Sequence, residues 1–407
     1  MIFRRSARTL VHLTLAMAAA ALHGQAVVSS FTDIGTLGGD VSYAYGINDS
    51  GEVVGKSPTG EVFPDDPFLY ADGNLTDLND NTPGLNIMET ATAINNAGQV
   101  VTDIHIVEAY TTDVSYLTPG NFGHPGINLG TLGGPSTVGL AVNSFGEVAG
   151  YSLTDDGATH AFLHSGGSAD YEDYGNMTDL GTLGGSNSYA YGINDSAEVV
   201  GAAEIGGGFV YVHAFLYTNG TMTDLGTLGG DESQANGINN SGQITGWAEI
   251  PGDLYTHAFL DENGTMTDLG TLGGLDSQAN GINAAGEVVG NSTYDFTTSE
   301  HAFFYDDGTM YDLNTLAAAY LSNGSTPGFI SLNSATAIND LGQIIGQGTY
   351  RDASGDDYDQ AFLLTVEVPE PAAGAVILGA GALLYGVVRR RIKNTLTTAK
   401  MECGGSV

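Results

Sequence analysis

The sequence predicts an all-β protein, a seven-bladed β-propeller of four-stranded antiparallel blades. The first observation is an internal repeat, Asp-Leu-Gly-Thr-Leu-Gly-Gly, which is complete at 179–185, 224–230 and 268–274 and appears elsewhere in altered or degenerate form. The copies start at Asp33, Asp77, Asn128, Asp179, Asp224, Asp268 and Asp312. The spacing is therefore 44 to 51 residues, a period typical of solenoids and propellers.

The second observation is that each unit contains four short extended runs. In the fifth unit they are Ser233–Asn239, Gln243–Glu249, His257–Leu260 and Thr265–Leu269. The runs are rich in β-branched and aromatic residues and lack helical periodicity. Asn-Asn-Ser-Gly and Asp-Glu-Asn-Gly join the strands of the two hairpins, and Asn and Gly accept the positive φ of tight turns. Four antiparallel strands make one propeller blade.

The third observation concerns the two ends of the repeat domain, 30–366. The seventh unit stops at Leu364, after its third strand, whereas a spare fourth strand, 30–34, precedes the first unit. We therefore expect the N-terminal strand to complete the last blade and close the ring. The alternative is an open β-solenoid, which would need polar caps and gains nothing from this offset.

Residues 1–26 are typical of a signal peptide. Arg4, Arg5 and Arg8 precede an apolar run over 10–22, and Gly-Gln-Ala ends the segment with small residues at the cleavage position. The alternative is an uncleaved membrane anchor. The only cysteine, Cys403, lies in the tail, so the exported domain is expected to fold without disulfides.

The C-terminal segment has three parts in order. Pro369-Glu370-Pro371 precedes an uncharged apolar run, 372–388, and the basic cluster Arg389, Arg390 and Arg391 follows it. The run is long enough for one transmembrane helix, and the basic cluster would keep the tail, 394–407, in the cytoplasm. Residues 368–393 resemble the PEP-CTERM sorting signal of bacteria that make exopolysaccharide. The resemblance implies processing by an exosortase-type enzyme, although the tail is longer than such signals usually have. The alternative is a plain membrane anchor.

The repeats also resemble the HAF family of bacterial extracellular repeat proteins. His-Ala-Phe stands at 160–162, 213–215, 257–259 and 301–303, beside the Gly-Thr-Leu-Gly-Gly turn and a Gly-Ile-Asn strand. The second and third units depart most from this pattern. The resemblance implies export and repetition and brings no activity or catalytic residue.

Charge excludes one class of function. The chain has 10 Lys and Arg against 47 Asp and Glu. Only Lys56 and Arg351 are basic between residues 27 and 371, and every acidic residue except Glu402 lies in that stretch. Phosphate binding requires Lys or Arg to replace counterions, so nucleic acid is not an expected partner.

No pattern marks an enzyme. The exported part has no cysteine and no Gly-x-Ser-x-Gly elbow, and the recurrent histidines fan outwards on successive blades, too far apart to share a metal. We expect each histidine ring to hydrogen-bond a neighbouring blade. The small residues before each Ile-Asn or Val-Asn (Gly192, Gly237, Gly281, Ala93, Ala141 and Ala337) are expected where the inner strands crowd one another.

Two kinds of binding residue remain as candidates. Asp352, Asp356, Asp357 and Asp359 fall within eight residues and could offer oxygens to Ca²⁺. Tyr211, Tyr255 and Tyr294 lie in variable segments between second and third strands, where exposed aromatic rings would suit sugars or a protein partner.

The sequence as a whole predicts a non-enzymatic protein of the cell surface or extracellular matrix. It would bind exopolysaccharide or a surface protein and be held by its C-terminal helix before processing. The alternatives are a calcium-stabilised structural module and, less favoured, a glycan-acting propeller enzyme, which would need carboxylates converging at the channel mouth.

Overall fold

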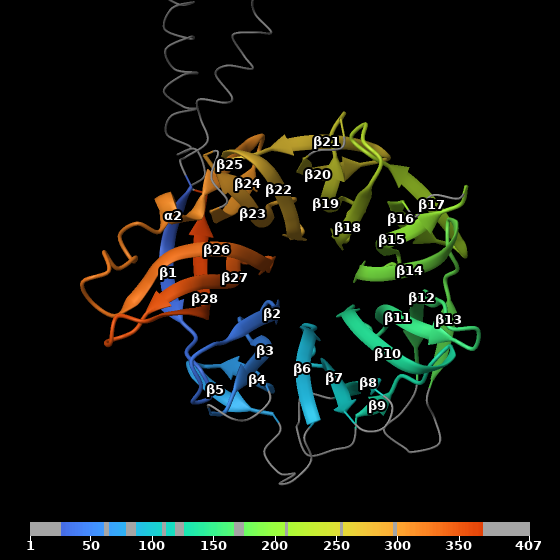
Figure 1. Ribbon diagram of the computed structural model, residues 1–407, viewed down its shortest axis with the longest axis horizontal. Helices are drawn as coiled ribbons and strands as arrows, with labels where there is room; N and C mark the ends of the chain where they lie inside the picture. The colour runs from blue at the N-terminus through green and yellow to red at the C-terminus, as the bar shows by residue number, and fades with distance from the viewer. Residues whose placement is uncertain are drawn as a thin grey trace, which may run out of the picture. The chain divides into compact units, whose positions relative to one another are not determined.

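The computed structural model of the chain describes residues 26–60, 65–78, 87–107, 111–118, 126–166, 175–207, 211–252, 255–295 and 299–368. In this part of the chain the strands form seven four-stranded sheets, and Figure 1 shows them arranged as blades around a central channel. The seven-bladed propeller predicted from the repeats is confirmed.

Six blades are each built from four consecutive strands, ordered from the channel outwards. Blade 1 is β2 (Tyr43–Ile47), β3 (Val53–Pro58), β4 (Asp65–Ala71) and β5 (Asn74–Asp77). Blade 2 is β6 (Ile87–Ile94), β7 (Val100–Val107), β8 (Thr111–Thr118) and β9 (Ile127–Asn128). Blade 3 is β10 (Gly133–Val142), β11 (Val148–Thr154), β12 (Thr159–Ser165) and β13 (Asn176–Asp179). Blade 4 is β14 (Gly184–Ile193), β15 (Val199–Ile205), β16 (Val212–Thr218) and β17 (Thr221–Gly226). Blade 5 is β18 (Ser233–Ile238), β19 (Ile244–Glu249), β20 (Thr256–Glu262) and β21 (Thr265–Gly270). Blade 6 is β22 (Gly273–Ile282), β23 (Val288–Tyr294), β24 (Glu300–Asp306) and β25 (Thr309–Asp312).

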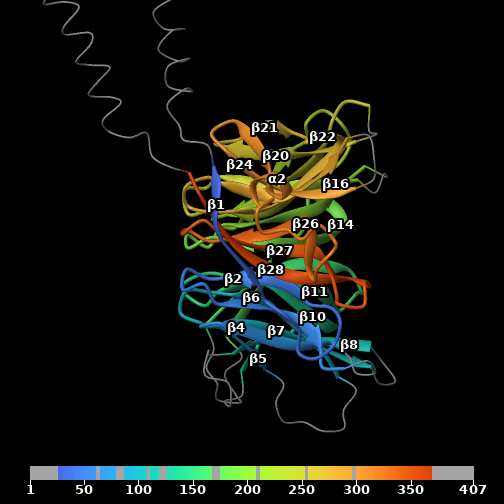
Figure 2. The ribbon, with the colours of Figure 1, turned by 90° about the vertical axis from the view of Figure 1, so that its left-hand side faces the viewer.

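Blade 7 joins the two ends of the ring. It consists of β26 (Gly328–Ile338), β27 (Gln343–Arg351), β28 (Asp357–Glu367) and, as the outermost strand, β1 (Val27–Asp33). Figure 2 shows β1 beside β28, at opposite ends of the colour scale. The Phe31 ring stacks on Phe362 at 6.1 Å between ring centres and meets Phe329 edge-on at 5.5 Å. The predicted closure by the N-terminal strand is confirmed. The short helix α2 (Leu313–Leu316) follows β25.

The hydrophobic core lies between successive blades. In one cluster Ala190, Val199 and Phe215 of blade 4 pack with Ala149 and Ala161 of blade 3, all fully buried. The Phe of each His-Ala-Phe lies opposite a second-strand glycine, as Phe215 does opposite Gly201. A Cβ at Gly201 would come within 1.9 Å of the Tyr189 carbonyl oxygen and 2.9 Å of the Phe215 ring, so no larger residue fits there without a shift of the backbone.

The inner strands crowd one another as predicted. A Cβ at Gly192 would lie 3.2 Å from the Asn236 carbonyl oxygen and 3.3 Å from Gly237 Cα, both on the next inner strand. A Cβ at Gly281 would lie 3.1 Å from Ala337 Cα. The alternation of Gly and Ala in this slot is therefore a packing requirement.

At one end of the channel seven asparagines link the blades into a closed ring, which we call the asparagine ring. They follow the innermost strands and are 3–5% exposed: Asn48, Asn95, Asn143, Asn194, Asn239, Asn283 and Asn339. Each Nδ2 donates to the backbone carbonyl of the corresponding asparagine in the next blade at 2.9–3.2 Å, and the last donates back to the first. Each Oδ1 accepts two backbone N–H groups of its own turn. These buried amides therefore satisfy their own turn and the neighbouring blade together.

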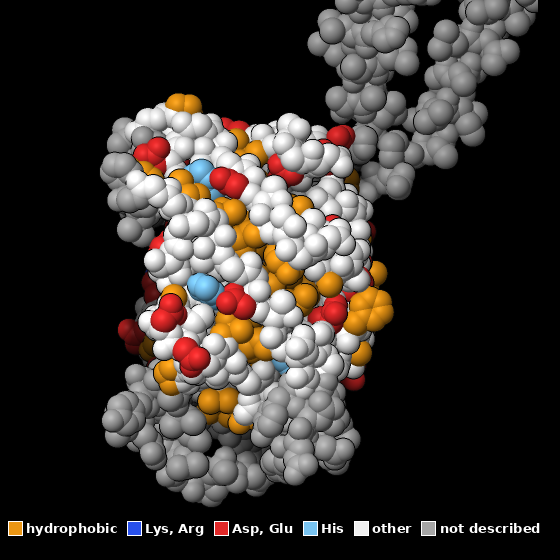
Figure 3. Space-filling model, turned by 90° about the vertical axis from the view of Figure 1, so that its right-hand side faces the viewer, with side chains coloured by type: hydrophobic (Ala, Val, Ile, Leu, Met, Phe, Trp, Pro, Cys, Tyr) orange, Lys and Arg blue, Asp and Glu red, His pale blue; other side chains and the backbone are white. Residues whose placement is uncertain are grey.

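Each repeated histidine binds an aspartate of its own blade, in place of the hydrogen bond to a neighbouring blade that the sequence predicts. Each Nδ1 lies 2.9–3.1 Å from an aspartate at or near the end of the fourth strand of its own blade, in the pairs His160–Asp179, His213–Asp224, His257–Asp268 and His301–Asp312. Figure 3 shows histidine beside acidic side chains on the outer side of the ring. The repeat period places the histidine on the third strand, but only the register of β12 with β13, where Phe162 pairs with Asp179, brings the aspartate to it.

The predicted terminal signals lie outside the described residues, apart from Ala26 and Val368. This holds for the signal-peptide body, Pro369-Glu370-Pro371, the predicted helix 372–388 and Arg389 to Arg391. Within the described residues, no helix combines the length and apolar character that a membrane crossing requires.

Candidate functional site in the central channel

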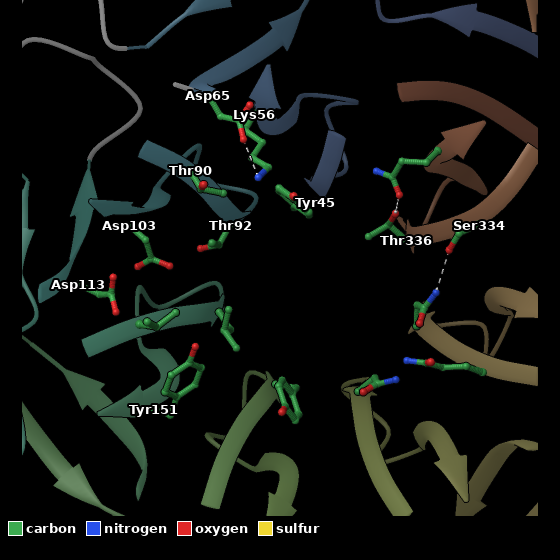
Figure 4. Close-up of a pocket in the computed structure, with 17 residues that line it drawn as sticks. Tyr45, Lys56, Asp65, Thr90, Thr92, Asp103, Asp113, Tyr151, Ser334 and Thr336 are labelled. Atoms are coloured by element: carbon green, nitrogen blue, oxygen red, sulfur yellow. Dashed lines mark hydrogen bonds and ion pairs between the residues drawn. The ribbon is translucent and has the colours of Figure 1, made fainter. Parts of the chain in front are cut away.

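A cavity of about 770 Å³ lies in the channel, on the side away from the asparagine ring. This volume is typical of small-molecule and cofactor sites. All seven blades contribute to its wall, and Figure 4 shows the side chains converging from the blades. The lining residues are Tyr45, Lys56, Asp65, Thr90, Thr92, Asp103, Asp113, Val138, Leu140, Tyr151, Tyr191, Asn236, Gln278, Asn280, Ser334, Thr336 and Gln347.

The strand register explains why these side chains meet. The second strand of each blade has a Gly opposite the Phe of the third strand, and in blade 2 Thr102 takes the place of this Gly. The residue that follows this position pairs with a residue of the innermost strand. The pairs are Tyr43–Lys56, Thr90–Asp103, Val138–Tyr151, Tyr189–Ala202, Gln234–Trp247, Gln278–Asn291 and Ser334–Gln347. No two pairs are alike, although the repeats agree closely at the core and asparagine positions. The repeats therefore differ at this end of the channel, where several of the paired residues line the cavity.

Blade 1 places the one basic side chain of the lining. Lys56 Nζ lies 2.8 Å from Asp65 Oδ2 and 5.6 Å from the centre of the Tyr43 ring. Burial acts to lower the pKa of Lys56, but the hydrogen bond with Asp65 and the nearby tyrosines outweigh it, so that the pKa is raised. Lys56 is therefore charged and already paired. Figure 4 shows this pair on the same side of the cavity as Asp103 and Asp113.

Blade 2 places two further carboxyl groups in the wall, Asp103 on β7 and Asp113 on β8. Burial raises the pKa of Asp103 to about 7, against the lowering effect of hydrogen bonds from Ser115 Oγ and the Gly139 N–H, and the charge of Asp113 raises it further. Asp103 is thus poised to gain or lose a proton near neutral pH. Blade 2 is also where Thr102 and Tyr116 replace the Gly and Phe of the other repeats.

Tyrosines line the cavity beside these acids. Burial raises the pKa of Tyr191 to about 12, with contributions from Tyr151 and Tyr189. Burial also raises the pKa of Tyr151, and the charges of Asp103 and Asp113 add to this effect. The Tyr151 ring meets Tyr189 edge-on at 5.2 Å. These phenols stay protonated and can donate hydrogen bonds to a ligand.

Amides and hydroxyls form the opposite wall, from blades 5, 6 and 7, and are held by bonds between blades. Asn236 Nδ2 donates to the Ala279 carbonyl at 2.7 Å, and Asn280 Nδ2 to the Ala335 carbonyl at 2.9 Å. Gln347 Nε2 donates to the Ala44 carbonyl at 3.2 Å. Because these bonds orient the amides in advance, the wall offers polar groups in set positions to a ligand.

The three tyrosines predicted as binding residues lie outside this cavity, on blades 4, 5 and 6. The Tyr211 and Tyr255 carbonyls accept the N–H groups of Ile205 and Ile250 at 3.0 and 3.2 Å. Tyr294 is 41% exposed and stacks on the His301 ring at 4.6 Å. Tyr211 and Tyr255 directly precede the third strands of their blades, and Tyr294 ends the second strand of blade 6, where it pairs with Gly273 of the innermost strand.

The predicted calcium residues lie in the hairpin between β27 and β28. Asp352 Oδ1 accepts the N–H groups of Ser354 and Asp356 at 2.8 and 2.9 Å, which stabilises the turn. Asp357 holds Arg351 through two bonds of 2.6 and 2.7 Å. Across the described residues there is no group of three or more His, Cys, Asp and Glu arranged to hold a metal ion. Calcium binding stays a prediction.

The sequence interpretation missed the cavity residues. Asp103 and Asp113 lie in the second repeat, one of the two that depart most from the pattern of the others. The sequence did contain a signal for these positions. When the seven repeats are aligned at their asparagines, the residue directly after the second-strand Gly (the position of Asp103) is different in every repeat.

Comparisons with known proteins find distant structural similarity alone. No family model matches the chain, and no curated protein matches it. Among solved structures, the β-propeller domain of the Trilobed protease from Pyrococcus furiosus is similar at 9% identity and a TM-score of 0.43, covering 81% of this chain and 97% of that one. A protein of unknown function from Dyadobacter fermentans is similar at 10% identity and a TM-score of 0.38, covering 84% of this chain and 99% of that one. The resemblance to HAF-repeat and PEP-CTERM proteins stays a prediction.

Proposed function

We propose that the protein is an exported, non-enzymatic binding protein of the cell surface or extracellular matrix, and that its channel cavity binds a carbohydrate. The cavity is the observation that carries this proposal. It is formed at the positions where the seven repeats differ, and its lining combines tyrosines with amides and hydroxyls.

The lining suits a sugar for two reasons. Aromatic rings such as Tyr45 and Tyr151 offer apolar surface together with a polar tip, and a sugar ring has both apolar C–H faces and hydroxyl edges. The oriented amides Asn236 and Asn280 supply donors and acceptors for those hydroxyls. A rigid scaffold with varied residues at one end is also how propellers present binding sites.

Export and retention are supported by the sequence. The predicted signal peptide 1–26 and the PEP-CTERM-like segment 368–393 favour transit through the inner membrane. The predicted helix 372–388 would anchor the protein until an exosortase-type enzyme processes it near Pro369-Glu370-Pro371. Its expected partner is extracellular polysaccharide or a surface protein, and no nucleic acid.

The test is titration calorimetry of the purified protein with a panel of neutral and charged oligosaccharides. We expect at least one to bind, and Tyr191→Ala to weaken its binding tenfold or more because Tyr191 lines the cavity. Tyr255→Ala, outside the cavity, is the matched control. If Tyr255→Ala abolishes binding and Tyr191→Ala leaves it unchanged, the binding site includes Tyr255 and lies outside the cavity, and the cavity proposal is wrong.

A glycan-acting enzyme is the second candidate, favoured by Asp65, Asp103 and Asp113 converging on the cavity. A carboxyl group with a pKa near 7 is suited to general acid catalysis. Incubation of the bound oligosaccharide with the protein tests this directly. Shortened products that disappear with Asp113→Asn would establish the enzyme, and an unchanged oligosaccharide would leave a binding protein.

The calcium-stabilised module is tested separately, by melting the protein with and without a chelator. A lower melting temperature in the chelator that is restored by Ca²⁺ and lost in Asp352→Asn would place calcium at the β27–β28 hairpin.

A further inference from the structure

The charge balance of the cavity wall indicates which class of sugar it accepts. The stretch between residues 27 and 371 has two basic residues, and both are already paired. Lys56 binds Asp65 within the cavity, and Arg351 binds Asp357 at the edge of blade 7. Lys56 therefore has no spare charge to offer to an anionic ligand. The lining holds three acidic side chains, Asp65, Asp103 and Asp113, and one basic side chain, Lys56, so acidic groups outnumber basic groups in the wall.

The two carboxyl groups of blade 2 lie close to each other and to aromatic rings. The charge of Asp113 acts on Asp103, and both act on the Tyr151 phenol. Figure 4 shows Asp103 and Asp113 on neighbouring strands with Tyr151 beside them. Carboxylates held out of bulk water are stabilised by a bound cation, and a cation also gains from an aromatic face within about 6 Å.

The Asp103 carboxyl is built into the wall and does not move freely. Ser115 Oγ lies within hydrogen-bonding distance of its Oδ1 and, at 2.9 Å, of the Thr137 carbonyl oxygen in the next blade, so its one proton can be donated to either acceptor. The Gly139 N–H, also in blade 3, lies 3.3 Å from the same Oδ1 and 2.8 Å from Ser115 Oγ. Such bonds between blades 2 and 3 position the carboxyl in advance, as a specific site requires.

We propose that the cavity selects glycans that carry free amino groups, with the ammonium group bound between Asp103, Asp113 and the Tyr151 ring. The sugar ring and its hydroxyls then lie toward Asn236, Asn280 and Gln347 on the opposite wall. This inference rests on the proposed carbohydrate-binding function and adds its charge class. N-acetylation removes the cation, and a uronic acid brings a like charge to the acidic wall, so both weaken binding.

The experiment compares three hexasaccharides by titration calorimetry with the purified full chain: fully deacetylated chitosan hexamer, its N-acetylated form and a galacturonic acid hexamer. Measurements at 0.15 M and 0.5 M salt separate the cavity from the general attraction of an acidic surface, which is screened at high salt. We expect the deacetylated hexamer to bind at least tenfold more tightly than the N-acetylated one at both salt concentrations, and the uronate not to bind.

Variants identify the site. In Asp103→Asn and in Asp113→Asn, the ratio of the affinities for the deacetylated and N-acetylated hexamers should fall close to one. Asp231 is an exposed acid of blade 5 outside the cavity, so Asp231→Asn should leave this ratio unchanged. Asparagine keeps the size and the accepting oxygen of aspartate, and circular dichroism of each variant confirms the fold. If Asp231→Asn lowers the preference as much as Asp103→Asn does, surface attraction explains the binding and the inference is overturned.

The remaining outcomes separate this inference from the proposed function. The N-acetylated hexamer could bind tightly, with binding that is abolished by Tyr191→Ala and unaffected by Asp103→Asn. This result would overturn the selection for amino groups and support carbohydrate binding. Equal binding of spermidine and the deacetylated hexamer would show a site for amines and no sugar specificity. Failure of every glycan to bind would overturn both.

Discussion

The two ends of the central channel are formed by the same seven strands, but the residues are identical in every blade at one end and different in every blade at the other. At one end the same asparagine follows every innermost strand and repeats the same bonds seven times. At the other end the paired residues of the first two strands differ in every blade. The identical end satisfies a requirement of the ring, and the varied end is free to acquire a ligand.

The difference follows from geometry. A closed ring needs each blade to meet its neighbour in the same way, so the asparagine of one repeat cannot change without breaking the bond that it makes to the next blade. Residues such as Gln278 face the cavity, where a change disturbs no repeated contact. A repeat protein can therefore change its specificity one blade at a time while its architecture stays the same.

The largest expected effect comes from breaking the uniform end. In Asn283→Ala the turn loses an oxygen that accepts the Ala285 and Glu287 N–H groups at 3.1 and 3.0 Å, and the Asn339 carbonyl loses a donor at 3.2 Å. Because these groups are buried, we expect the free energy of unfolding to fall by about 3–5 kcal/mol, measured by urea denaturation.

The control for this change is Asn176→Ala, because Asn176 is exposed on β13 and its side chain bonds only locally to Thr178 at 3.3 Å. We expect less than about 0.5 kcal/mol there. Equal losses in the two variants would show that the asparagine ring has no special part in stability.

A smaller effect of opposite sign is expected from Asp103→Asn at the varied end. The folded pKa of Asp103 is raised to about 7 from 3.8, so the folded state keeps a proton that the unfolded state has lost between these pH values. Wild-type stability therefore falls as the pH rises from about 4 to about 7. The charge of Asp113 also raises the pKa of Asp103.

The Asp103→Asn variant does not lose stability in this way as the pH rises. Its free energy of unfolding should therefore exceed that of the wild type by about 1–3 kcal/mol at pH 8 and should be close to that of the wild type at pH 4. Urea denaturation at both pH values measures the difference, with Asp231→Asn as the control. A difference that is the same at pH 4 and pH 8 would mean that Asp103 does not carry a raised pKa.

Most of the fold could be predicted from the sequence because its rules are local and repeated. The turn residues, the strand lengths and the period predicted the blades. The spare strand, 30–34, predicted that the N-terminal strand completes the last blade. The partner of each histidine could not be found in this way. It depends on the register of the third and fourth strands, which a period of 44 to 51 residues does not contain.

The candidate site was harder to predict for the same reason. Asp103 and Asp113 meet only because β7 and β8 pair and the ring places them beside Tyr151, a residue of the next blade. Tyr211, Tyr255 and Tyr294 were chosen because loops often bind ligands, but sequence position alone does not say which side chains face the channel. Specificity in this fold is a property of several blades at once.

The smallest expected effect comes from Gln278→Ala, which lies at the varied end on β22, the strand of blade 6 that Asn283 follows. Gln278 lines the cavity and pairs across the strands with Asn291, whose side chain accepts from Asn280 at 3.2 Å. Removing its amide leaves this contact in place and exposes the site to water, so we expect less than about 0.5 kcal/mol of lost stability and a measurable loss of glycan affinity. Urea denaturation and calorimetry of these two variants of blade 6 separate stability from binding. A loss above about 1 kcal/mol for Gln278→Ala would show that the varied end also holds the ring together, and the division between the two ends would fail.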